Sequence, residues 1–248
     1  MTTRTPTIAL LYPGHAAEDD YPLAESALSG AVALPVVITD VESDDHTVEA
    51  MRAVGTGTRL LVGARTAQRH EPDALMWACT SGSFLYGWEG AHQQVASVSE
   101  ATGLPVSSTS LAFAAACRAL DITSVAIAAT YPAPVADGFS VFLRDAGISV
   151  ASAAAHDIGT ATEAGTVDGD NLFEMVRSVD SDAAQAILLP DTALHTIGWI
   201  ADLEATVRKP ILTANQVTIW QGLQLLGVDI TADGLGHLFS VRRAISSS

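Results

Sequence analysis

The chain has 248 residues, of which 48% are hydrophobic, so it can bury a full core as one large α/β domain or as two small domains that share a cleft. Lysine and arginine total 12 against 28 aspartate and glutamate residues, which gives a formal net charge of -16. A field of this sign repels phosphate backbones and anionic membrane surfaces. We therefore expect neither nucleic acid nor a membrane as a partner.

No segment reaches the roughly 18 consecutive apolar residues of a membrane-spanning helix. The N-terminus, Met1 to Pro6, lacks the basic-then-apolar order of a signal peptide, so we expect a cytoplasmic protein. Cys79 and Cys117 are the two cysteines of the chain. Two thiols in a chain of this length, with no export signal, do not indicate a disulfide framework, and each is interpreted as a free thiol.

Short runs rich in Val, Ile and Leu are typical of buried parallel strands. In chain order these predicted strands are Ile8-Tyr12, Arg59-Gly63, Leu75-Cys79, Pro105-Ser107, Val125-Thr130, Ala186-Leu189 and Pro210-Thr213. Longer amphipathic or alanine-rich stretches lie between them and predict helices. The predicted helices are Gly87-Thr102, Leu111-Leu120, Pro134-Ala146, Asn171-Val179, Thr196-Val207 and Ile219-Leu226. This alternation indicates βαβ units with right-handed crossovers.

The two halves of the chain repeat three landmarks in the same order: a strand that ends in Tyr-Pro, a strand that ends in a polar cluster, and a Pro-led strand that runs into an apolar helix. The paired segments are Thr7-Gly14 with Ala126-Ala133, Ala74-Ser83 with Ala186-His195, and Leu104-Leu120 with Lys209-Leu225. The repeat predicts an internal duplication. The alternative is one ordinary doubly wound domain whose strand-turn-helix units look alike.

The duplication predicts an α/β fold of two pseudo-symmetric lobes, each a parallel sheet flanked by helices. We expect residues 1-113 with 216-248 to form the first lobe and residues 114-215 to form the second. Open α/β sheets bind ligands at the carboxyl ends of their strands, so the active site is expected in the cleft between the lobes. The residues that the repeat places there are Tyr12, Cys79, Tyr131 and Asp191.

The segment Trp77-Ser83 places a thiol where a hydrophobic strand ends. Cys79 is followed by Thr80, Ser81, a glycine and a serine, which lead toward a helix. Backbone N–H groups at such a turn, together with the helix dipole, lower the pKa of a thiol and hold an anion. The Thr80 and Ser81 hydroxyls add hydrogen bonds to a carboxylate or an enediolate. We therefore favour a functional Cys79 over the alternative of a small buried core residue.

Asp191 ends the equivalent strand of the second half, and His195 follows it at i, i+4. On a helix this spacing brings a carboxylate and an imidazole onto one face, as a base with its orienting partner. The alternative is an N-cap aspartate with a surface histidine. No further cluster of His, Cys or carboxylate residues has zinc-like spacing, so we expect no metal site.

Two further signals are interpreted as structural. Cys117 lies on the apolar face of a predicted helix, where a thiol behaves as a small hydrophobic residue. The acidic run Glu18-Asp19-Asp20 predicts a solvated loop. Because this loop follows Pro13 and Gly14, a role in sensing the substrate is the alternative.

The phrases "CTSGSF", "EATGLPVSSTS", "VAIAATY" and "ILLPDTALHTI" occur in this order along nearly the whole chain. Together they resemble the aspartate/glutamate racemase superfamily, and within it the branch of the maleate cis-trans isomerases and arylmalonate decarboxylases. The resemblance implies two pseudo-symmetric lobes, no cofactor, and a cysteine at one or both of the duplicated strand ends.

The resemblance also implies roles for individual residues. Cys79 matches the first catalytic cysteine of the racemases and maleate isomerases, a place that glycine occupies in the decarboxylase. Asp191 stands where these relatives have a second cysteine, and it is the departure from the pattern. The residues implied to bind substrate are Pro13, Gly14, Thr80, Ser81, Tyr131 and the Thr192 backbone.

The resemblance implies a cofactor-independent isomerase or decarboxylase that acts on a small dicarboxylic acid through one cysteine. A single thiol suffices to protonate the enediolate left by loss of carbon dioxide, or to add reversibly to a double bond. Two alternatives stay open: an aspartate or glutamate racemase with a Cys/Asp pair, and a non-catalytic acid-binding protein. The sequence is compatible with a homo-oligomer and does not name the acid.

Overall fold

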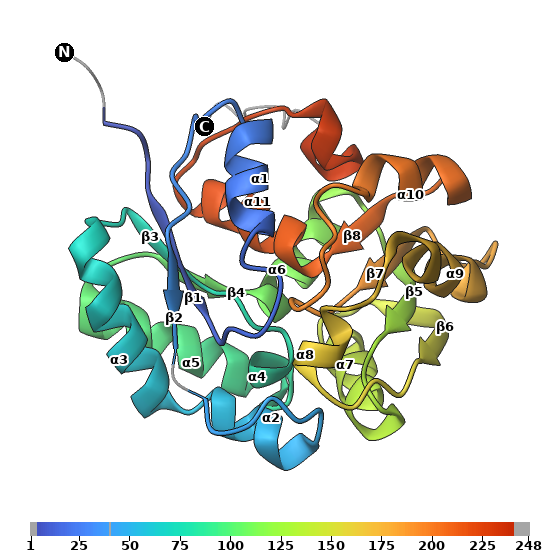
Figure 1. Cartoon of the computed structure of the whole chain (residues 1–248), viewed down its shortest axis with the longest axis horizontal. Coiled ribbons are helices and arrows are strands. Elements are labelled where there is room, and N and C mark those ends of the chain that lie inside the picture. Colours follow the sequence, from blue (N-terminus) through green and yellow to red (C-terminus); the bar gives the residue numbers. More distant parts are fainter. Residues whose placement is uncertain (1–3, 40, 241–248) are drawn as a thin grey trace.

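The computed structural model describes residues 4–39 and 41–240. Two parallel four-stranded sheets form its frame, with the orders β2-β1-β3-β4 and β6-β5-β7-β8 (Figure 1). The strands are β1 (Ile8–Tyr12), β2 (Val36–Ile38), β3 (Ala74–Trp77), β4 (Val106–Ser108), β5 (Ser124–Ala129), β6 (Ser149–Ala155), β7 (Ala186–Leu189) and β8 (Ile211–Thr213). Because the two orders are equivalent, the predicted fold class of two similar α/β lobes is confirmed.

Helices connect the strands and cover the sheets. They are α1 (Asp20–Ala27), α2 (Val48–Val54), α3 (Gly57–Ala67), α4 (Ser81–Phe84), α5 (Gly87–Thr102), α6 (Thr109–Ala119), α7 (Ala133–Asp145), α8 (Ala161–Ala164), α9 (Gly169–Val179), α10 (Ile200–Val207) and α11 (Ala214–Leu225). The sequence sets their starts locally. The Ser108 side chain accepts from the backbone N–H of Leu111 at the start of α6, and Thr213 and Gln216 form a capping box at the start of α11.

The prediction of a strand at Arg59-Gly63 was wrong, because these residues lie within α3. The buried residues Leu60, Gly63, Ala64 and Ala67 follow a helical period, which the short apolar run concealed. Two strands were not predicted. Both β2 and β6 lie at sheet edges, and β6 is a half-exposed run of small residues, so neither carries a buried apolar run.

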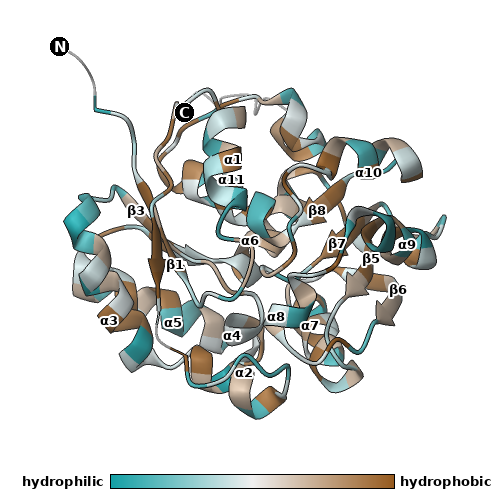
Figure 2. Cartoon of the chain, viewed as in Figure 1, coloured by the Kyte–Doolittle hydropathy of each residue, from teal (hydrophilic) through white to brown (hydrophobic). Residues whose placement is uncertain are grey.

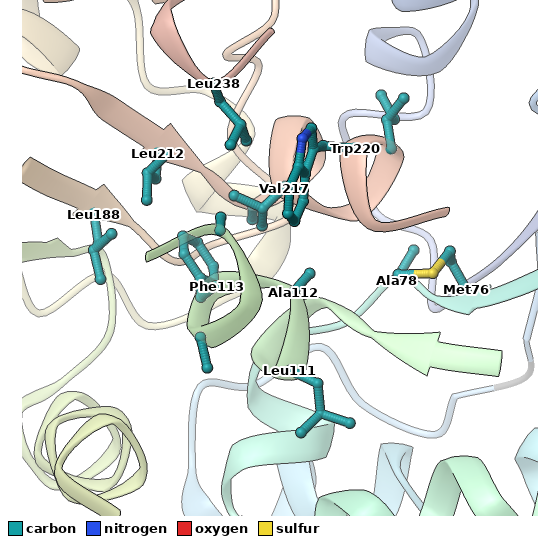
Figure 3. Close-up of a cluster of buried hydrophobic side chains, with 14 of the residues drawn as sticks. Met76, Ala78, Leu111, Ala112, Phe113, Leu188, Leu212, Val217, Trp220 and Leu238 are labelled. Carbon is teal, nitrogen blue, oxygen red and sulfur yellow. The ribbon is translucent and has the colours of Figure 1, made fainter. Parts of the chain in front are cut away.

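One core joins the two sheets. All residues of β1, β3, β7 and β8 are buried, and Figure 2 shows hydrophobic strands inside outer helices with many hydrophilic positions. Helices α6 and α11 pack against each other in the middle of the molecule (Figures 1 and 3). Side chains of β3, α6, β7, β8 and α11 meet there in one cluster, among them Met76, Phe113, Leu188, Leu212 and Val217. The strand ends of both sheets are therefore held in fixed relation.

None of the helices in residues 4–39 and 41–240 combines the length and apolar character needed to cross a membrane. The lobe boundaries at residues 113 and 216 stay a prediction. Residues 241–248, which that prediction assigns to the first lobe, lie outside the described part of the chain.

Candidate active site

A pocket lies where strands of both sheets end. Its walls include residues that directly follow β1, β3, β5 and β7, and it contains about 460 Å³ of empty space, counting its open mouth. The predicted site residues that line it are Pro13, Gly14, Cys79, Ser81, Tyr131, Asp191 and Thr192. Thr80 and Tyr12 are the predicted site residues that do not line the pocket. The Tyr12 hydroxyl still contacts the pocket wall, because it donates to the carbonyl of Thr192, 180 positions away in the chain, while the roles of all these residues stay predictions.

The Cys79 thiol is buried in the pocket wall. The side chain is 4% exposed, the backbone N–H of Gly82 donates to Sγ at 3.4 Å, and the Ser81 hydroxyl lies 3.8 Å from Sγ. Burial raises the pKa of the thiol to about 11, since the two hydrogen bonds lower it by less and the nearby Asp191 raises it further. The expectation of a lowered thiol pKa was therefore wrong, because desolvation outweighs the donors of the turn.

Asp191 faces the pocket from the second sheet and is 4% exposed. One carboxylate oxygen accepts from the Thr130 hydroxyl, and the other accepts from the Ala193 backbone N–H at 2.9 Å. The predicted shared helix face with His195 was wrong, because residues 191–199 form turns and α10 begins only at Ile200. His195 instead forms an exposed pair with Asp19, with its Nδ1 2.9 Å from Oδ1.

Two tyrosines brace the turns around the pocket. The Tyr131 hydroxyl donates to the carbonyl of Pro190 at 2.9 Å, and the Tyr12 hydroxyl donates to the carbonyl of Thr192 at 3.2 Å. Burial is the largest cause that raises the pKa of each phenol well above its ordinary range. Both hydroxyls therefore stay protonated at neutral pH. Tyr131 can bind a ligand only if it shares or exchanges its bond to Pro190.

The turn after each central strand leaves hydrogen-bond donors without a partner. The Thr80 hydroxyl is fully buried and makes no well-formed hydrogen bond within the described chain, although it is near enough to the Tyr131 phenol to act on the pKa of that group. No residue among those described accepts from the backbone N–H of Thr80 or of Thr192. Such groups cost free energy unless a ligand or water satisfies them. Donors of this kind are what a carboxylate or an enediolate requires, and no lysine or arginine within residues 4–39 and 41–240 lines the pocket.

Sequence reasoning missed one wall of the pocket. Between residues 41 and 54 it is formed by Val41, Ser43, Asp44, Asp45, His46, Met51 and Val54. The Asp44 carboxylate accepts from the Thr162 hydroxyl at 2.6 Å, and His46 Nδ1 lies 2.9 Å from the Ile158 carbonyl oxygen. These residues follow β2, so detection of that edge strand would have identified them as another strand end.

The sequence predicted a solvated loop for Glu18-Asp19-Asp20. This prediction was wrong for Asp20, which is the first residue of α1 and is buried. Asp20 is 3% exposed, and its carboxylate accepts from the backbone N–H of Thr196 at 2.9 Å and from Asn215 Nδ2 at 2.9 Å. Burial raises the pKa of Asp20, and these hydrogen bonds lower it by less. Its neighbour Asp19 is exposed, as expected.

No three His, Cys, Asp or Glu side chains group as metal ligands within residues 4–39 and 41–240. The polar groups that face the pocket are one thiol, three carboxylates, two imidazoles and several hydroxyls. Two equivalent parallel sheets, with a thiol at one strand end and a carboxylate at the mirrored one, define a two-lobed α/β protein with a small-molecule site between its lobes.

The chain belongs to the arylmalonate decarboxylase family, whose model matches residues 46–239. It is 27% identical over 179 residues to the arylmalonate decarboxylase of Bordetella bronchiseptica, which covers 71% of this chain and 75% of that protein. It is 26% identical over 184 residues to the maleate isomerase of Nocardia farcinica, covering 71% of this chain and 73% of that protein.

The fold is shared with solved structures of the same kind. A maleate isomerase from Pseudomonas putida S16 bound to maleate superimposes with a TM-score of 0.86 over 96% of this chain and 98% of that one, at 19% identity. The resemblance inferred from the four sequence phrases is therefore confirmed.

Proposed function

We propose that the chain is a cofactor-independent isomerase or decarboxylase of a small dicarboxylic acid, with Cys79 as its reactive group. Its relatives are named maleate isomerases and an arylmalonate decarboxylase. The observation that carries the proposal is the Cys79 thiol, which lies in a pocket that Ser81, Thr192 and Asp191 also line.

Decarboxylation fits this geometry best. With a pKa of about 11, Cys79 is a neutral thiol at neutral pH and therefore a proton donor. The C–C bond to one carboxylate breaks, carbon dioxide leaves, and its electron pair forms an enediolate with the remaining carboxylate. The Cys79 S–H then gives its proton to the α-carbon, and solvent returns a proton to the thiolate. One thiol completes this cycle, and Asp191 has no part in the proton transfer.

While the enediolate exists, the two oxygens of the remaining carboxylate carry two negative charges. The Ser81 hydroxyl and the Thr192 N–H belong to residues that line the pocket and are the donors that would hold the enediolate. Fixed donors in a pocket that excludes water stabilise such charge more than water does, because they need no reorganisation. No lysine or arginine of residues 4–39 and 41–240 lines the pocket, so these N–H and hydroxyl dipoles are central to binding.

Maleate-type isomerisation is the second candidate, because three curated relatives are maleate isomerases. The enzyme of Nocardia farcinica has been solved with a covalent succinylcysteine intermediate. In this chain the Cys79 thiolate would add to one carbon of the double bond, a proton would add to the other, and loss of both after rotation would give the trans acid. The raised pKa of Cys79 makes the thiolate scarce, which is why we rank this reaction second.

A proton NMR screen in deuterated buffer separates these reactions. Aryl- and alkylmalonates should lose carbon dioxide and gain one deuterium at the α-carbon, whereas maleate should give fumarate only if the thiolate adds. Exchange at the α-carbon of aspartate or glutamate would instead show the racemase alternative.

Replacement of Cys79 by Ala should lower turnover at least about 10³-fold with no change in the circular dichroism spectrum. Cys117→Ala is the control, because that thiol is buried in α6 away from the pocket. Retained activity of Cys79→Ala would overturn the mechanism. Protection of Cys79 from alkylation by a bound acid, with no turnover of any acid, would favour the non-catalytic alternative.

A further inference from the structure

The carbonyl of Thr192 is held by two buried side chains. It accepts from the Tyr12 hydroxyl at 3.2 Å and from Asn215 Nδ2 at 3.2 Å. Both donors, Asn215 and Tyr12, are completely buried. Neither side chain lines the pocket, so neither is available to a ligand.

All side-chain hydrogen bonds of Asn215 go to this turn and to α1. Its amide nitrogen also lies 2.9 Å from the carboxylate of Asp20 and 3.3 Å from the carbonyl of Leu194, and its amide oxygen accepts from the Tyr21 hydroxyl at 3.1 Å. An amide has two N–H donors. One serves Asp20, and the other is shared by the carbonyls of Thr192 and Leu194.

Asp20 completes the arrangement from α1. Its carboxylate accepts from the backbone N–H groups of Thr196 and Ile197 as well as from Asn215. The turn that follows β7 is thus tied at four backbone positions to α1 and to the first turn of α11 (Figure 1). This network links helices that follow β1 and β8 to the pocket wall that follows β7.

We propose that Asn215, oriented by Asp20, is a positioning residue for the reaction. The donors from Asn215 and Tyr12 fix the direction of the Thr192 carbonyl and with it the plane of the Thr192–Ala193 peptide. The N–H of this same peptide belongs to Ala193 and donates to the carboxylate of Asp191 at 2.9 Å, so the plane held by Asn215 also holds Asp191 in the pocket wall. The inference rests on the proposed function, because Asp191, Thr192 and Ala193 line the pocket assigned to the bound acid.

The neighbouring residue Gln216 offers a matched control. It is also a buried amide in the first turn of α11, but its Nε2 donates to the carbonyl of Leu235 at 2.8 Å and its Oε1 accepts from the Thr213 N–H. Neither of these side-chain hydrogen bonds goes to the turn at residues 191–197. Loss of either amide removes buried hydrogen bonds, so both variants should lose stability, whereas only one should lose the catalytic geometry.

The test compares Asn215→Ala with Gln216→Ala, using the best dicarboxylate substrate of the wild-type protein. We expect kcat/KM to fall about 30- to 100-fold in Asn215→Ala, because a misplacement of ~1 Å in a positioned group costs about 10²-fold. For Gln216→Ala we expect a change under about threefold at a similar loss of Tm. Tyr12→Phe removes the second donor to the Thr192 carbonyl and should also lower kcat/KM. It replaces Asn215→Ala in the test if that variant does not fold.

Equal losses of kcat/KM in Asn215→Ala and Gln216→Ala at equal loss of Tm would overturn the proposal, as would a folded Asn215→Ala with unchanged kinetics. Crystal structures of the wild type and of the variant provide a readout that does not depend on turnover. A rotated Thr192–Ala193 peptide in Asn215→Ala supports the proposal, and an unmoved peptide overturns it. Absence of turnover in the wild type refutes the proposed function alone.

Discussion

The reactivity of Cys79 depends on which of two opposing effects is larger. The N–H of Gly82 and the hydroxyl of Ser81 favour the thiolate, whereas burial and the charge of Asp191 favour the thiol. Burial is the largest of these effects, and it raises the pKa to about 11. A buried thiol of this kind is a weak nucleophile and a proton donor, which is the role that an enediolate requires.

This balance predicts the pH dependence of alkylation. Only the thiolate reacts with iodoacetamide, so the rate at Cys79 should rise about tenfold per pH unit from pH 7 to pH 10. It should not level off near 9, the ordinary pKa of cysteine. Mass spectrometry of the Cys79 peptide in a Cys117→Ala background measures the rate at one thiol. A plateau at or below pH 9 would show that the turn donors outweigh burial.

The carboxyl of Asp20 predicts a pH dependence of stability. Burial raises its pKa above the ordinary value of 3.8, although hydrogen bonds and the charge of His195 act in the opposite direction. A carboxyl with a raised pKa stabilises the fold at low pH, and this contribution is lost as pH rises through the raised value. Asp20→Asn cannot ionise. The Tm of Asp20→Asn minus that of the wild type should therefore become more positive from pH 4 to pH 8.

Calorimetry at both pH values measures this difference. Asp182→Asn, which removes a carboxyl at an exposed position, is the control. A difference for Asp20→Asn that becomes more negative with rising pH would contradict the raised pKa.

At the scale of elements, the turn that carries Cys79 is supported by the junction between α2 and α3. The Gln94 side chain of α5 donates to the carbonyls of both Gly55 and Gly82, at 2.7 and 2.9 Å. A Cβ atom at Gly55 would lie 2.0 Å from the carbonyl oxygen of Gly82, so backbone would have to move. Gly82 in turn donates to the Cys79 sulfur. A segment without any catalytic residue thus sets the geometry of the thiol.

Gly55→Ala should therefore lower both stability and activity. We expect a loss of about 1–3 kcal/mol in the free energy of unfolding, typical of an overpacked site, and a fall in kcat because the Gly82 N–H moves relative to Sγ. Gly57→Ala is the control, since its Cβ would meet nothing within 4 Å. Urea unfolding and steady-state kinetics measure both effects. Equal behaviour of the two variants would show that the Gly55–Gly82 contact is unimportant.

At the scale of the whole molecule, the pocket belongs to neither sheet alone. Helices α6 and α11 join the sheets through a shared core, and the segment after β2 reaches across to α8. There the carboxylate of Asp44 accepts from the N–H of Thr162 at 3.1 Å and from its hydroxyl at 2.6 Å. These bonds are the largest cause of the lowered pKa of Asp44, so the contact is strongest when the carboxyl is ionised.

Removal of this contact should weaken substrate binding. Asp44→Ala and Thr162→Val should each raise KM several-fold with little change in kcat, because the pocket wall at residues 43–46 loses an anchor while Cys79 keeps its surroundings. The double variant should show less than the sum of the two effects, since both remove one interaction. Steady-state kinetics of the three variants test this. Fully additive effects would show that the two side chains act separately.

Much of the site could be derived from sequence because the relevant patterns are local. The repeated landmarks paired Cys79 with Asp191 and Tyr12 with Tyr131, since a buried parallel strand followed by a turn leaves a readable run of residues. The strands β1 and β7 and the helix α5 have the predicted bounds for the same reason. Strand β2 and the pocket wall after it were missed, because a three-residue edge strand carries no such run.

The sequence by itself determined the α/β class, the duplication and which residues end the central strands, because these follow from periodicity within a few residues of each position. Tertiary structure alone decided that burial raises the pKa of the Cys79 thiol, that Asp20 is buried, and that Asn215 holds the Thr192 carbonyl. Each of these depends on desolvation and hydrogen bonds supplied by segments far away in the chain. Spacing along a sequence carries no measure of how much water a folded neighbour excludes.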